Sequence, residues 1–212
     1  MKSSKFKQYV FTSLFISLFT LQNTQLGAQT FDKGTITVNA GIGFISTLNY
    51  GFGGVSRSPA FCLAGEYGIM KLGPGVIGGG IAFGYQSASY TENYGAFYYK
   101  DKWSTTLIGA RATYHPDFLK TDKAELYGIV QLSITHFGYS YTTNDPLVGN
   151  SYYYSDHSLN TSFHPYLMVG AKYYFTKNFG VYSEFGYDIS LIKIGLTLKF
   201  DKAVQSVTKN KK

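Results

Sequence analysis

Charged residues are scarce in this chain. Aspartate, glutamate, lysine and arginine make up 15% of its 212 residues, whereas they make up about a quarter of a typical soluble domain. Long apolar runs are missing as well, because no internal segment approaches the roughly 20 apolar residues that a membrane helix needs. These absences argue against a conventional soluble domain and against a helical membrane protein. Any membrane crossing must therefore be made by strands that are polar on one face.

Cysteine is almost absent, and the histidines form no recognisable site. The single cysteine, Cys62, cannot form an internal disulfide. None of the four histidines is followed two positions later by a serine, where a base and a nucleophile would share one strand face. His157 and His164 match no standard metal-ligand spacing. We therefore expect no cofactor, no metal and no enzymatic activity, with a membrane-embedded lipid-modifying enzyme as an alternative.

The positive charge lies mostly at the two ends of the chain. The formal net charge is +7, but a large part of it comes from the first lysines and from the last residues: Lys2, Lys5, Lys7, Lys202, Lys209, Lys211 and Lys212. The segment between them is close to neutral, so the charge does not indicate a nucleic-acid partner.

The termini also define the domain organisation. Residues 1–28 have a lysine-bearing start, an apolar run from Tyr9 to Leu21 and a small-residue end before Gln29, which is typical of a secretory signal peptide. The run is too short to span a membrane, although an uncleaved anchor is the competing interpretation. We expect a single domain over residues 29–200 and a basic tail over residues 201–212.

Glycine and aromatic residues are abundant, and side-chain character alternates along much of the chain. The sequence has 24 glycines, 20 tyrosines and 17 phenylalanines. Since successive strand side chains face opposite sides, alternation of apolar and small or polar residues indicates strands. The pattern predicts about eight strands, at residues 35–44, 61–69, 77–86, 103–114, 126–135, 167–175, 181–187 and 192–200. A long polar and aromatic loop is expected after the third, and the longest loop at residues 139–162.

The alternation alone does not say which face points outward. A lipocalin-like soluble barrel has its apolar face inside and many charges outside. Here the second face carries mostly Gly, Ala, Ser and Thr, which suits a narrow filled lumen. The apolar face has aromatic residues near both ends, as expected at the two membrane interfaces: Tyr67, Tyr114, Phe175 and Phe200 at one end, and Phe44, Phe61, Tyr85 and Phe163 at the other.

Three segments near the end of the chain resemble those of small outer-membrane β-barrel proteins of the OmpA/OmpX-like, porin-superfamily type: residues 170–176, 184–187 and 195–200. The resemblance implies an all-β, eight-stranded antiparallel transmembrane up-and-down barrel, a monomer in contact with outer-membrane lipid of a Gram-negative cell. It further implies that the barrel-assembly machinery recognises the final aromatic residue of the last strand, which is Phe200 here. The tail after Phe200 departs from the family pattern.

Five charged residues are predicted to face the lumen: Glu66, Arg111, Lys172, Glu184 and Lys193. Charges inside a narrow barrel must pair to offset the loss of hydration. A stabilising network is therefore the simpler interpretation, with Glu66 and Glu184 as the possible partners of Arg111. A narrow porin-like path for small solutes is the alternative.

Aromatic residues are concentrated in the two longest predicted loops: Tyr90, Tyr94, Phe97, Tyr98, Tyr99, Tyr152, Tyr153 and Tyr154. Tyrosines on a rigid scaffold provide amphipathic contact area at low entropic cost. These residues are the candidates for binding a surface ligand. Alternatively, the rings extend the strands and rest on one another.

Overall fold

The computed structural model describes residues 31–47, 54–148 and 161–201. Within these ranges the strands are β1 (Ile36–Ser46), β2 (Ser56–Arg57), β3 (Ala60–Lys71), β4 (Gly75–Tyr94), β5 (Phe97–Pro116), β6 (Ala124–Thr143), β7 (Thr161–Tyr174), β8 (Phe179–Gly186) and β9 (Ser190–Phe200). Two short 3-10 helices, η1 (Asp117–Leu119) and η2 (Pro146–Val148), follow β5 and β6. The predicted signal peptide, the tail after Asp201 and residues Tyr152 to Tyr154 lie outside the described residues.

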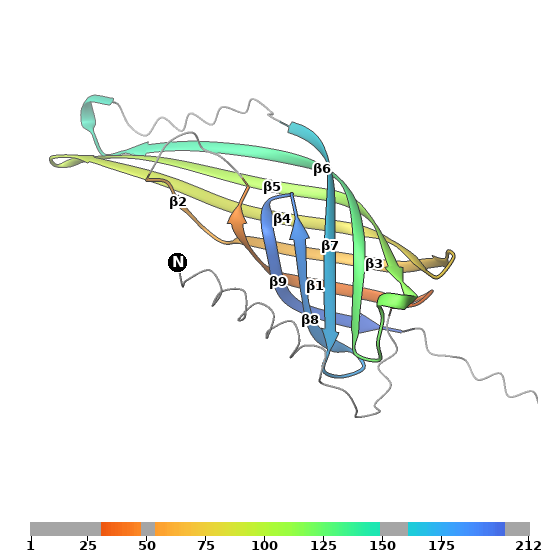
Figure 1. The fold of residues 1–212 in the computed structure, drawn as a ribbon. Coiled ribbons are helices and arrows are strands. Elements are labelled where there is room, and N and C mark those ends of the chain that lie inside the picture. The colour runs from red at the N-terminus through yellow and green to blue at the C-terminus, as the bar shows by residue number, and fades with distance from the viewer. Residues whose placement is uncertain (1–30, 48–53, 149–160, 202–212) are drawn as a thin grey trace, which may run out of the picture.

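The eight long strands form one closed antiparallel barrel (Figure 1). Consecutive long strands pair with each other, and β1 pairs with β9 to close the wall, with Ile36 opposite Phe200. The two-residue strand β2 pairs with β4 and lies outside this circuit. The predicted eight-stranded up-and-down barrel is therefore confirmed. Closure matters because it leaves no open backbone edge along the wall, where unpaired groups would be costly in lipid.

The two faces of the wall have the polarity of a membrane barrel. In β9, Lys193, Thr197 and Lys199 are at most 5% exposed, whereas Ile194 and Leu196 between them are about half exposed. The same alternation runs through β3 and β5, as their burial patterns show. Apolar side chains therefore face outward and polar side chains fill the interior, which rules out the lipocalin-like arrangement. No helix among the described residues is long and apolar enough to cross a membrane.

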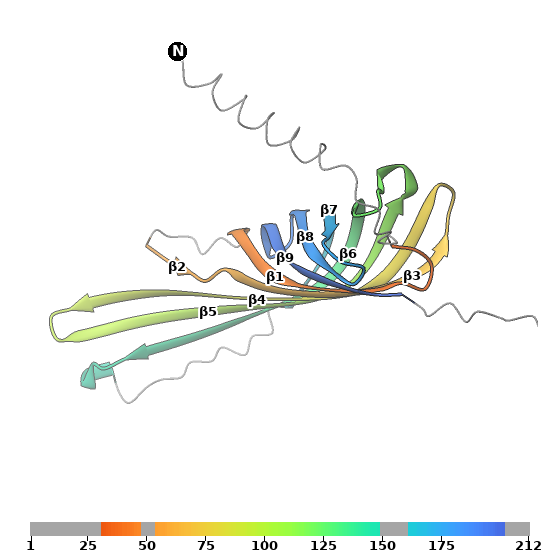
Figure 2. The same cartoon turned by 90° about the horizontal axis from the view of Figure 1, so that it is seen from below.

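Three neighbouring strands are much longer than the wall requires. β4, β5 and β6 have 20 residues each, whereas β8 has 8. About ten residues suffice for a tilted strand to cross the hydrocarbon core. β4 pairs with β3 only up to Tyr85, and β6 pairs with β7 only up to His136. Beyond these points residues 86–94, 97–105 and 137–143 continue as one sheet of three long strands, which we call the projecting sheet, and β2 is paired along its base. Figures 1 and 2 show it extending well past the rest of the barrel.

The projecting sheet replaces the first of the two long loops expected from the sequence. The prediction that Tyr90, Tyr94, Phe97, Tyr98 and Tyr99 lie in a loop is wrong, because all five belong to β4 or β5. The two strands are joined by a turn of two residues, 95 and 96, and Gly95 has a φ of 60° that glycine adopts without strain. The loop predicted at residues 139–162 is also shorter, since β6 continues to residue 143 and β7 begins at residue 161.

Candidate functional site

The five predicted lumen charges are all buried inside the barrel. Glu66, Arg111, Lys172, Glu184 and Lys193 are between 2% and 5% exposed. Each occupies an inward position of a different strand, and the ion pairs divide them into two groups joined by Tyr127. Nothing in the sequence shows this division, because it depends on how far along the barrel each side chain lies.

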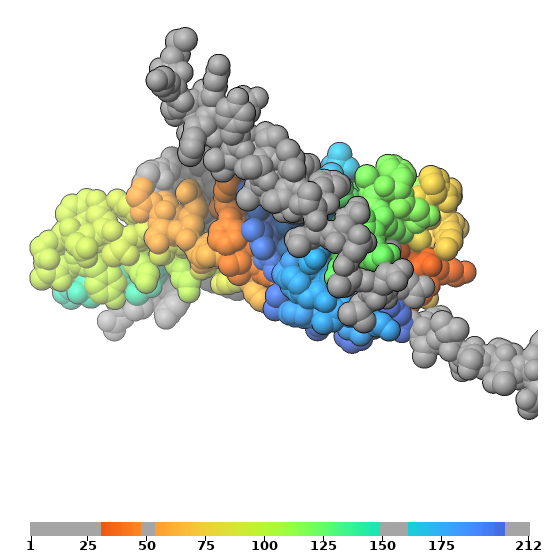
Figure 3. Space-filling view, turned by 60° about the horizontal axis from the view of Figure 1, so that its bottom comes forward, coloured from red at the N-terminus to blue at the C-terminus, as the bar shows by residue number. Residues whose placement is uncertain are grey.

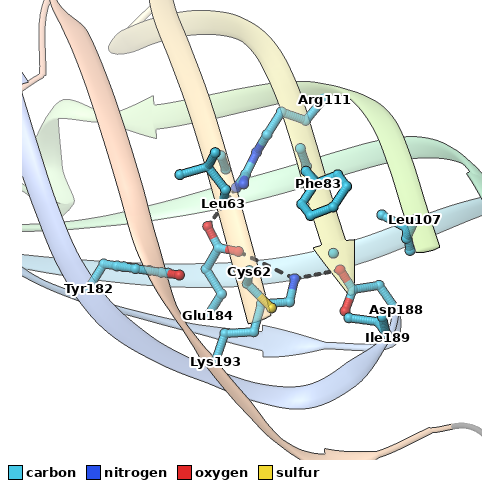
Figure 4. A pocket seen from close by; sticks show the side chains of 13 residues that line it. Cys62, Leu63, Phe83, Leu107, Arg111, Tyr182, Glu184, Asp188, Ile189 and Lys193 are labelled. Atoms are coloured by element: carbon cyan, nitrogen blue, oxygen red, sulfur yellow. Dashed lines mark hydrogen bonds and ion pairs between the residues drawn. The ribbon is translucent and has the colours of Figure 1, made fainter. Parts of the chain in front are cut away.

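The first group surrounds Glu184 (Figure 4). Arg111 Nη2 donates a hydrogen bond to Glu184 Oε1 over 2.6 Å, and Tyr127 Oη donates to the same oxygen over 3.1 Å. The other carboxylate oxygen, Oε2, lies 3.5 Å from Lys193 Nζ, which also bonds Asp188 Oδ2 over 2.5 Å. The open question of which carboxylate pairs with Arg111 is thereby answered in favour of Glu184. Two carboxylates and two cations neutralise one another here.

The second group surrounds Lys172. Its Nζ forms an ion pair with Glu66 Oε1, donates to Thr37 Oγ1 over 3.0 Å and lies 3.9 Å from Glu125 Oε1. The same Nζ lies 4.7 Å from the ring centre of Tyr127, a cation–π geometry. Because the Tyr127 hydroxyl bonds Glu184, its side chain links the two groups into one network.

An aromatic stack adjoins the second group. The ring of His115 lies between Phe31 and Tyr127, with centroid distances of 4.0 Å and 4.9 Å and nearly parallel planes. His115 Nδ1 is 3.5 Å from Glu125 Oε2 and Nε2 is 3.7 Å from Glu66 Oε2. Phe31 and His115 are both fully buried. This stack completes the filling of the barrel at the end where the chain enters it.

The segment before β1 closes that end of the barrel. The backbone N–H of Phe31 donates to Glu125 Oε2 over 3.1 Å, and its carbonyl oxygen accepts from Lys120 Nζ over 3.0 Å. Further along, Gly34 N–H donates to the Gly68 carbonyl over 2.8 Å, and Gly68 N–H donates to the carbonyl of Thr35 over 2.8 Å. Phe31 is therefore held by stacking of its ring and by hydrogen bonds to its backbone, and its side chain fills this end of the barrel.

Several residues of the network were not among the sequence candidates: Phe31, His115, Glu125, Asp188 and Lys199. Glu125 and His115 were overlooked because they lie at strand ends, just outside the expected boundaries, although both keep the inward parity of their strands. Lys199 shares the strand parity of Lys193 and is fully buried, but it is not among the five predicted lumen charges. It lies 4.9 Å from the ring centre of Tyr174 and 3.5 Å from Asp201 Oδ2.

The lumen offers little room for a solute. A cavity of about 10 Å³ is lined by Cys62, Leu107, Arg111, Glu184 and Lys193, among others (Figure 4), which is space for about one water molecule. Among the described residues no group of three or more His, Cys, Asp or Glu side chains could hold a metal ion. The arrangement fits a neutralised, packed interior better than a conduit.

The projecting sheet is the second candidate site, and its two faces differ sharply. The inner lumen face of the barrel continues onto a face that we call the aromatic face: Tyr90, Glu92, Tyr94, Phe97, Tyr99, Asp101, Trp103, Phe137, Tyr139 and Tyr141. The opposite face continues the lipid-facing surface and is mainly polar, with Tyr98, Lys100 and Lys102 on β5. In the space-filling view the yellow-green extension stands beyond the rest of the barrel (Figure 3). Polarity thus reverses where the strands leave the wall.

Side chains on the aromatic face touch one another but stay partly accessible. Tyr94 and Tyr99 meet edge to face with centroids 5.8 Å apart, and Trp103 lies 5.9 Å from Tyr139. Tyr94 is 60% exposed, and the other rings just named are half-buried. The rings therefore do rest on one another, as the simpler interpretation of the sequence expects, yet they leave an accessible aromatic surface on a regular sheet.

Three tyrosine hydroxyls on this side donate to carboxylates: Tyr94 to Glu92 over 2.6 Å, Tyr99 to Asp145 over 2.5 Å and Tyr139 to Asp101 over 2.5 Å. The bond to Asp145 raises the pKa of Tyr99 to about 12. Burial and then the bond to Asp101 raise the pKa of Tyr139 to about 12 as well, and the bond to Glu92 raises the pKa of Tyr94. These hydroxyls therefore remain protonated donors to their carboxylates at neutral pH.

The structure thus sorts the predicted binding aromatics. Tyr90, Tyr94, Phe97 and Tyr99 share the aromatic face, whereas Tyr98 lies on the opposite face. Phe200, the predicted assembly signal, lies at the end of β9 opposite Ile36 with its side chain 51% exposed outward. Its role in assembly stays a prediction.

Comparison with known proteins places the architecture. Residues 11–208 match the model of a family described as outer membrane protein beta-barrel domain. Among solved structures, the chain is similar to the N-terminal β-barrel domain of Pseudomonas aeruginosa OprF, with 14% identity, a TM-score of 0.40 and coverage of 80% of this chain and 100% of that one. It is also similar to Ail, the attachment invasion locus protein of Yersinia pestis, solved in complex with the heparin analogue sucrose octasulfate, with 12% identity, a TM-score of 0.41 and coverage of 79% and 99%. No curated protein matches the chain.

Proposed function

Since this chain belongs to the family of outer membrane protein β-barrel domains, we propose that it is a surface-binding protein whose contact surface is the aromatic face of the projecting sheet. The protein is located in the cell outer membrane. In this proposal the barrel is a monomeric anchor embedded in outer-membrane lipid, and it has no catalytic role. The projecting sheet holds the contact residues away from the membrane.

The orientation of the barrel supports an extracellular position for this sheet. Bacterial outer-membrane barrels have short turns on the periplasmic side and longer connections outside. Here the connections 72–74, 117–123 and 175–178 lie at one end, together with the closing segment at Phe31. The projecting sheet lies at the opposite end. Its aromatic face is therefore expected outside the cell.

The observation that carries the proposal is the regular placement of accessible aromatic side chains on strands. Strand backbones in a paired sheet are far more ordered than loops, so binding loses little conformational entropy. The projecting part of β4–β6 extends far beyond what membrane crossing needs. An anchor alone does not require this extension, whereas a contact surface held away from the membrane does.

The packed lumen supports the same choice over a channel. Ion pairs bridge β5 to β8 and β3 to β7 across the interior, and Phe31 fills one end of the barrel. A path for solutes would require several of these buried pairs to separate, at several kcal/mol for each uncompensated charge.

The test compares two faces of one sheet. Proteoliposomes carrying the protein are applied to an array of immobilised extracellular matrix proteins, peptides and oligosaccharides. We expect retention on at least one probe, strong loss with Tyr94→Ser/Tyr99→Ser, and full retention with the matched control Tyr98→Ser on the opposite face. Heat-dependent gel migration of each variant confirms that the barrel has assembled.

Three other results would overturn the proposal. Stepwise currents across planar bilayers in the absence of any retention would indicate a narrow porin-like channel. A change in lipid composition that depends on the protein in cells would indicate a lipid-modifying enzyme. Equal retention of the Tyr94→Ser/Tyr99→Ser variant and the parent protein would exclude the aromatic face as the contact surface.

A further inference from the structure

From the chemistry of the aromatic face we infer that its partner is a cationic polypeptide segment, rich in lysine or arginine. The inference rests on the proposed function, because it assumes that this face is the contact surface. It adds the class of partner, which follows from the charges, the hydrogen-bonding groups and a similar arrangement inside the barrel.

The charges of the projecting sheet are separated between its faces. Glu92 and Asp101 lie on the aromatic face, and Asp145 joins them through its bond to Tyr99. In residues 86–94, 97–105 and 137–143 the only lysines are Lys100 and Lys102, and these segments contain no arginine. Both lysines lie on the opposite face. Arg57 of β2 is paired with Ala88, which shares the face of Tyr90 and Trp103, so this arginine lies at the base of the aromatic face. Beyond that base the aromatic face is acidic, and its reverse is basic.

The hydrogen-bonding groups of this face are mostly acceptors. Three tyrosine hydroxyls already donate their hydrogen bonds to Glu92, Asp145 and Asp101. What remains for a partner is the free lone pairs of Glu92, Asp101 and the phenolic oxygens, together with the negative faces of the rings, because Asp145 is only 9% exposed. Ammonium and guanidinium groups carry only donors and bind both carboxylates and ring faces. An anionic partner would meet like charge and few donors.

The lumen contains the same arrangement with the cation supplied by the chain itself. Tyr127 donates to Glu184, and Lys172 lies over the Tyr127 ring at 4.7 Å. Tyr174 donates to Glu125 over 3.2 Å, and Lys199 lies over the Tyr174 ring at 4.9 Å. Each unit consists of a tyrosine, a carboxylate that accepts its hydroxyl, and a lysine above the ring.

The aromatic face repeats the tyrosine and carboxylate parts of this unit three times. In residues 86–94, 97–105 and 137–143 no lysine or arginine lies on that face to complete them, and Arg57 of β2 lies at its base, opposite Ala88. Glu92 on β4 and Asp101 on β5 are diagonal neighbours, since Glu92 is paired with Tyr99 and Asp101 with Tyr90, and such neighbours are about 7 to 8 Å apart. Side chains of an extended peptide recur on one side at about 7 Å. An extended segment with basic residues at alternate positions therefore matches the spacing of these two acidic groups.

The test uses the full barrel in nanodiscs of zwitterionic phosphatidylcholine, which keeps the lipid from attracting a cationic probe. Binding of a fluorescent oligolysine peptide is measured by anisotropy, with oligoglutamate and a neutral cello-oligosaccharide as comparison probes. We expect oligolysine to bind and oligoglutamate not to bind. The substitutions Glu92→Gln and Asp101→Asn together should weaken oligolysine binding about tenfold or more, since each removes a charge-assisted contact.

The matched control is Lys100→Gln/Lys102→Gln on the opposite face, which should bind oligolysine at least as tightly as the parent protein. Oligolysine binding that is unchanged by Glu92→Gln/Asp101→Asn would overturn the inference. So would binding of the oligosaccharide alone; if Tyr94→Ser/Tyr99→Ser abolished that binding, the proposed function would stand with a different partner class. If none of the three probes binds and Tyr94→Ser/Tyr99→Ser leaves retention on the array unchanged, both proposals fail.

Discussion

Arg111 on β5 donates from Nη2 to Oε1 of Glu184 on β8 over 2.6 Å, with both side chains buried. The two strands are separated in the barrel wall by β6 and β7. The ion pair therefore spans the interior and connects walls that no backbone ladder joins. It belongs to a network in which every buried cation described above has a carboxylate nearby, as burial of charge in a narrow lumen requires.

Replacing Arg111 with leucine should destabilise the folded barrel strongly. The substitution leaves Glu184 with Lys193 and the hydroxyl of Tyr127 but removes its shortest charged contact. Loss of one partner of a buried pair costs about 3 to 5 kcal/mol. The measurement is the midpoint of urea unfolding in lipid vesicles. The outward-facing Ala110→Val on the same strand is the control, and an unchanged midpoint for Arg111→Leu would show that the pair contributes nothing.

Replacing Phe31 with alanine should also destabilise the barrel, although the residue lies before the first strand. Its ring is fully buried against His115 and its removal leaves a cavity at the barrel mouth. Truncation of a buried phenylalanine costs about 3 to 5 kcal/mol. The same unfolding measurement applies, with the exposed neighbour Lys33→Ala as control. Equal midpoints for Phe31→Ala and the parent would mean that the segment before β1 does not close the barrel in lipid.

The alternation of side chains was sufficient to predict the barrel and its inside. Alternation assigns each strand residue to one face irrespective of where the strand begins. Glu66 and Arg111 are therefore correctly predicted to face inward, although the ends of their strands are not predicted correctly. The division of the lumen charges into two groups could not be predicted from the sequence. It depends on strand register and on the height of each residue in the barrel, which alternation does not encode.

The projecting sheet is not predicted from the sequence, because the apolar residues of the alternating pattern end where the strands leave the membrane. Outside lipid the outward face turns polar, so Thr91, Asn93 and Lys100 break the sequence signature of a membrane strand. The period of two nevertheless persists in the aromatic residues Phe97, Tyr99 and Trp103, with Asp101 between the last two. That persistence, with a glycine at the centre of the hairpin, was the signal that could have extended the strands.

Glycine on the inward face of β4 should be intolerant of even one added carbon. A Cβ placed on Gly80 would lie 1.9 Å from the carbonyl oxygen of Gly65 and 2.8 Å from Cα of Glu66. The neighbouring strand must move to admit it, and overpacking of this kind costs about 1 to 3 kcal/mol. The matched control is Gly128→Ala on the outward face of β6, where nothing lies within 4 Å of the added atom. We expect a lower unfolding midpoint for Gly80→Ala and an unchanged one for Gly128→Ala; the reverse order would contradict the packing described.

The hydrogen bond from Tyr99 to Asp145 should be visible in a titration with base. A free tyrosine ionises at a pKa near 10, whereas the bond to Asp145 raises the pKa of Tyr99 to about 12. The folded sheet therefore keeps this proton where an unfolded chain has lost it. The resulting stabilisation is fully present below pH 10 and disappears as the pH rises through about 12.

The ionisation of Tyr99 is isolated by subtracting the tyrosinate absorbance of Tyr99→Phe from that of the parent protein at each pH. We expect the difference to appear near pH 12 in the parent background and to move toward pH 10 when Asp145 is replaced by asparagine. A step near pH 10 in both backgrounds would show that the bond does not persist in solution.

The final aromatic residue should matter for the rate of assembly more than for the stability of the assembled barrel. Phe200 ends β9 with its ring 51% exposed on the outward face, so its removal leaves no cavity in the lumen. If the assembly machinery recognises this ring, Phe200→Ser should slow the appearance of the heat-modifiable form in cells while leaving the unfolding midpoint of refolded protein nearly unchanged. Phe175→Ser is the control, because that ring is also outward and 56% exposed but lies at a turn between β7 and β8. Equal assembly rates for the two variants would show that the position of Phe200 at the end of the last strand carries no special signal.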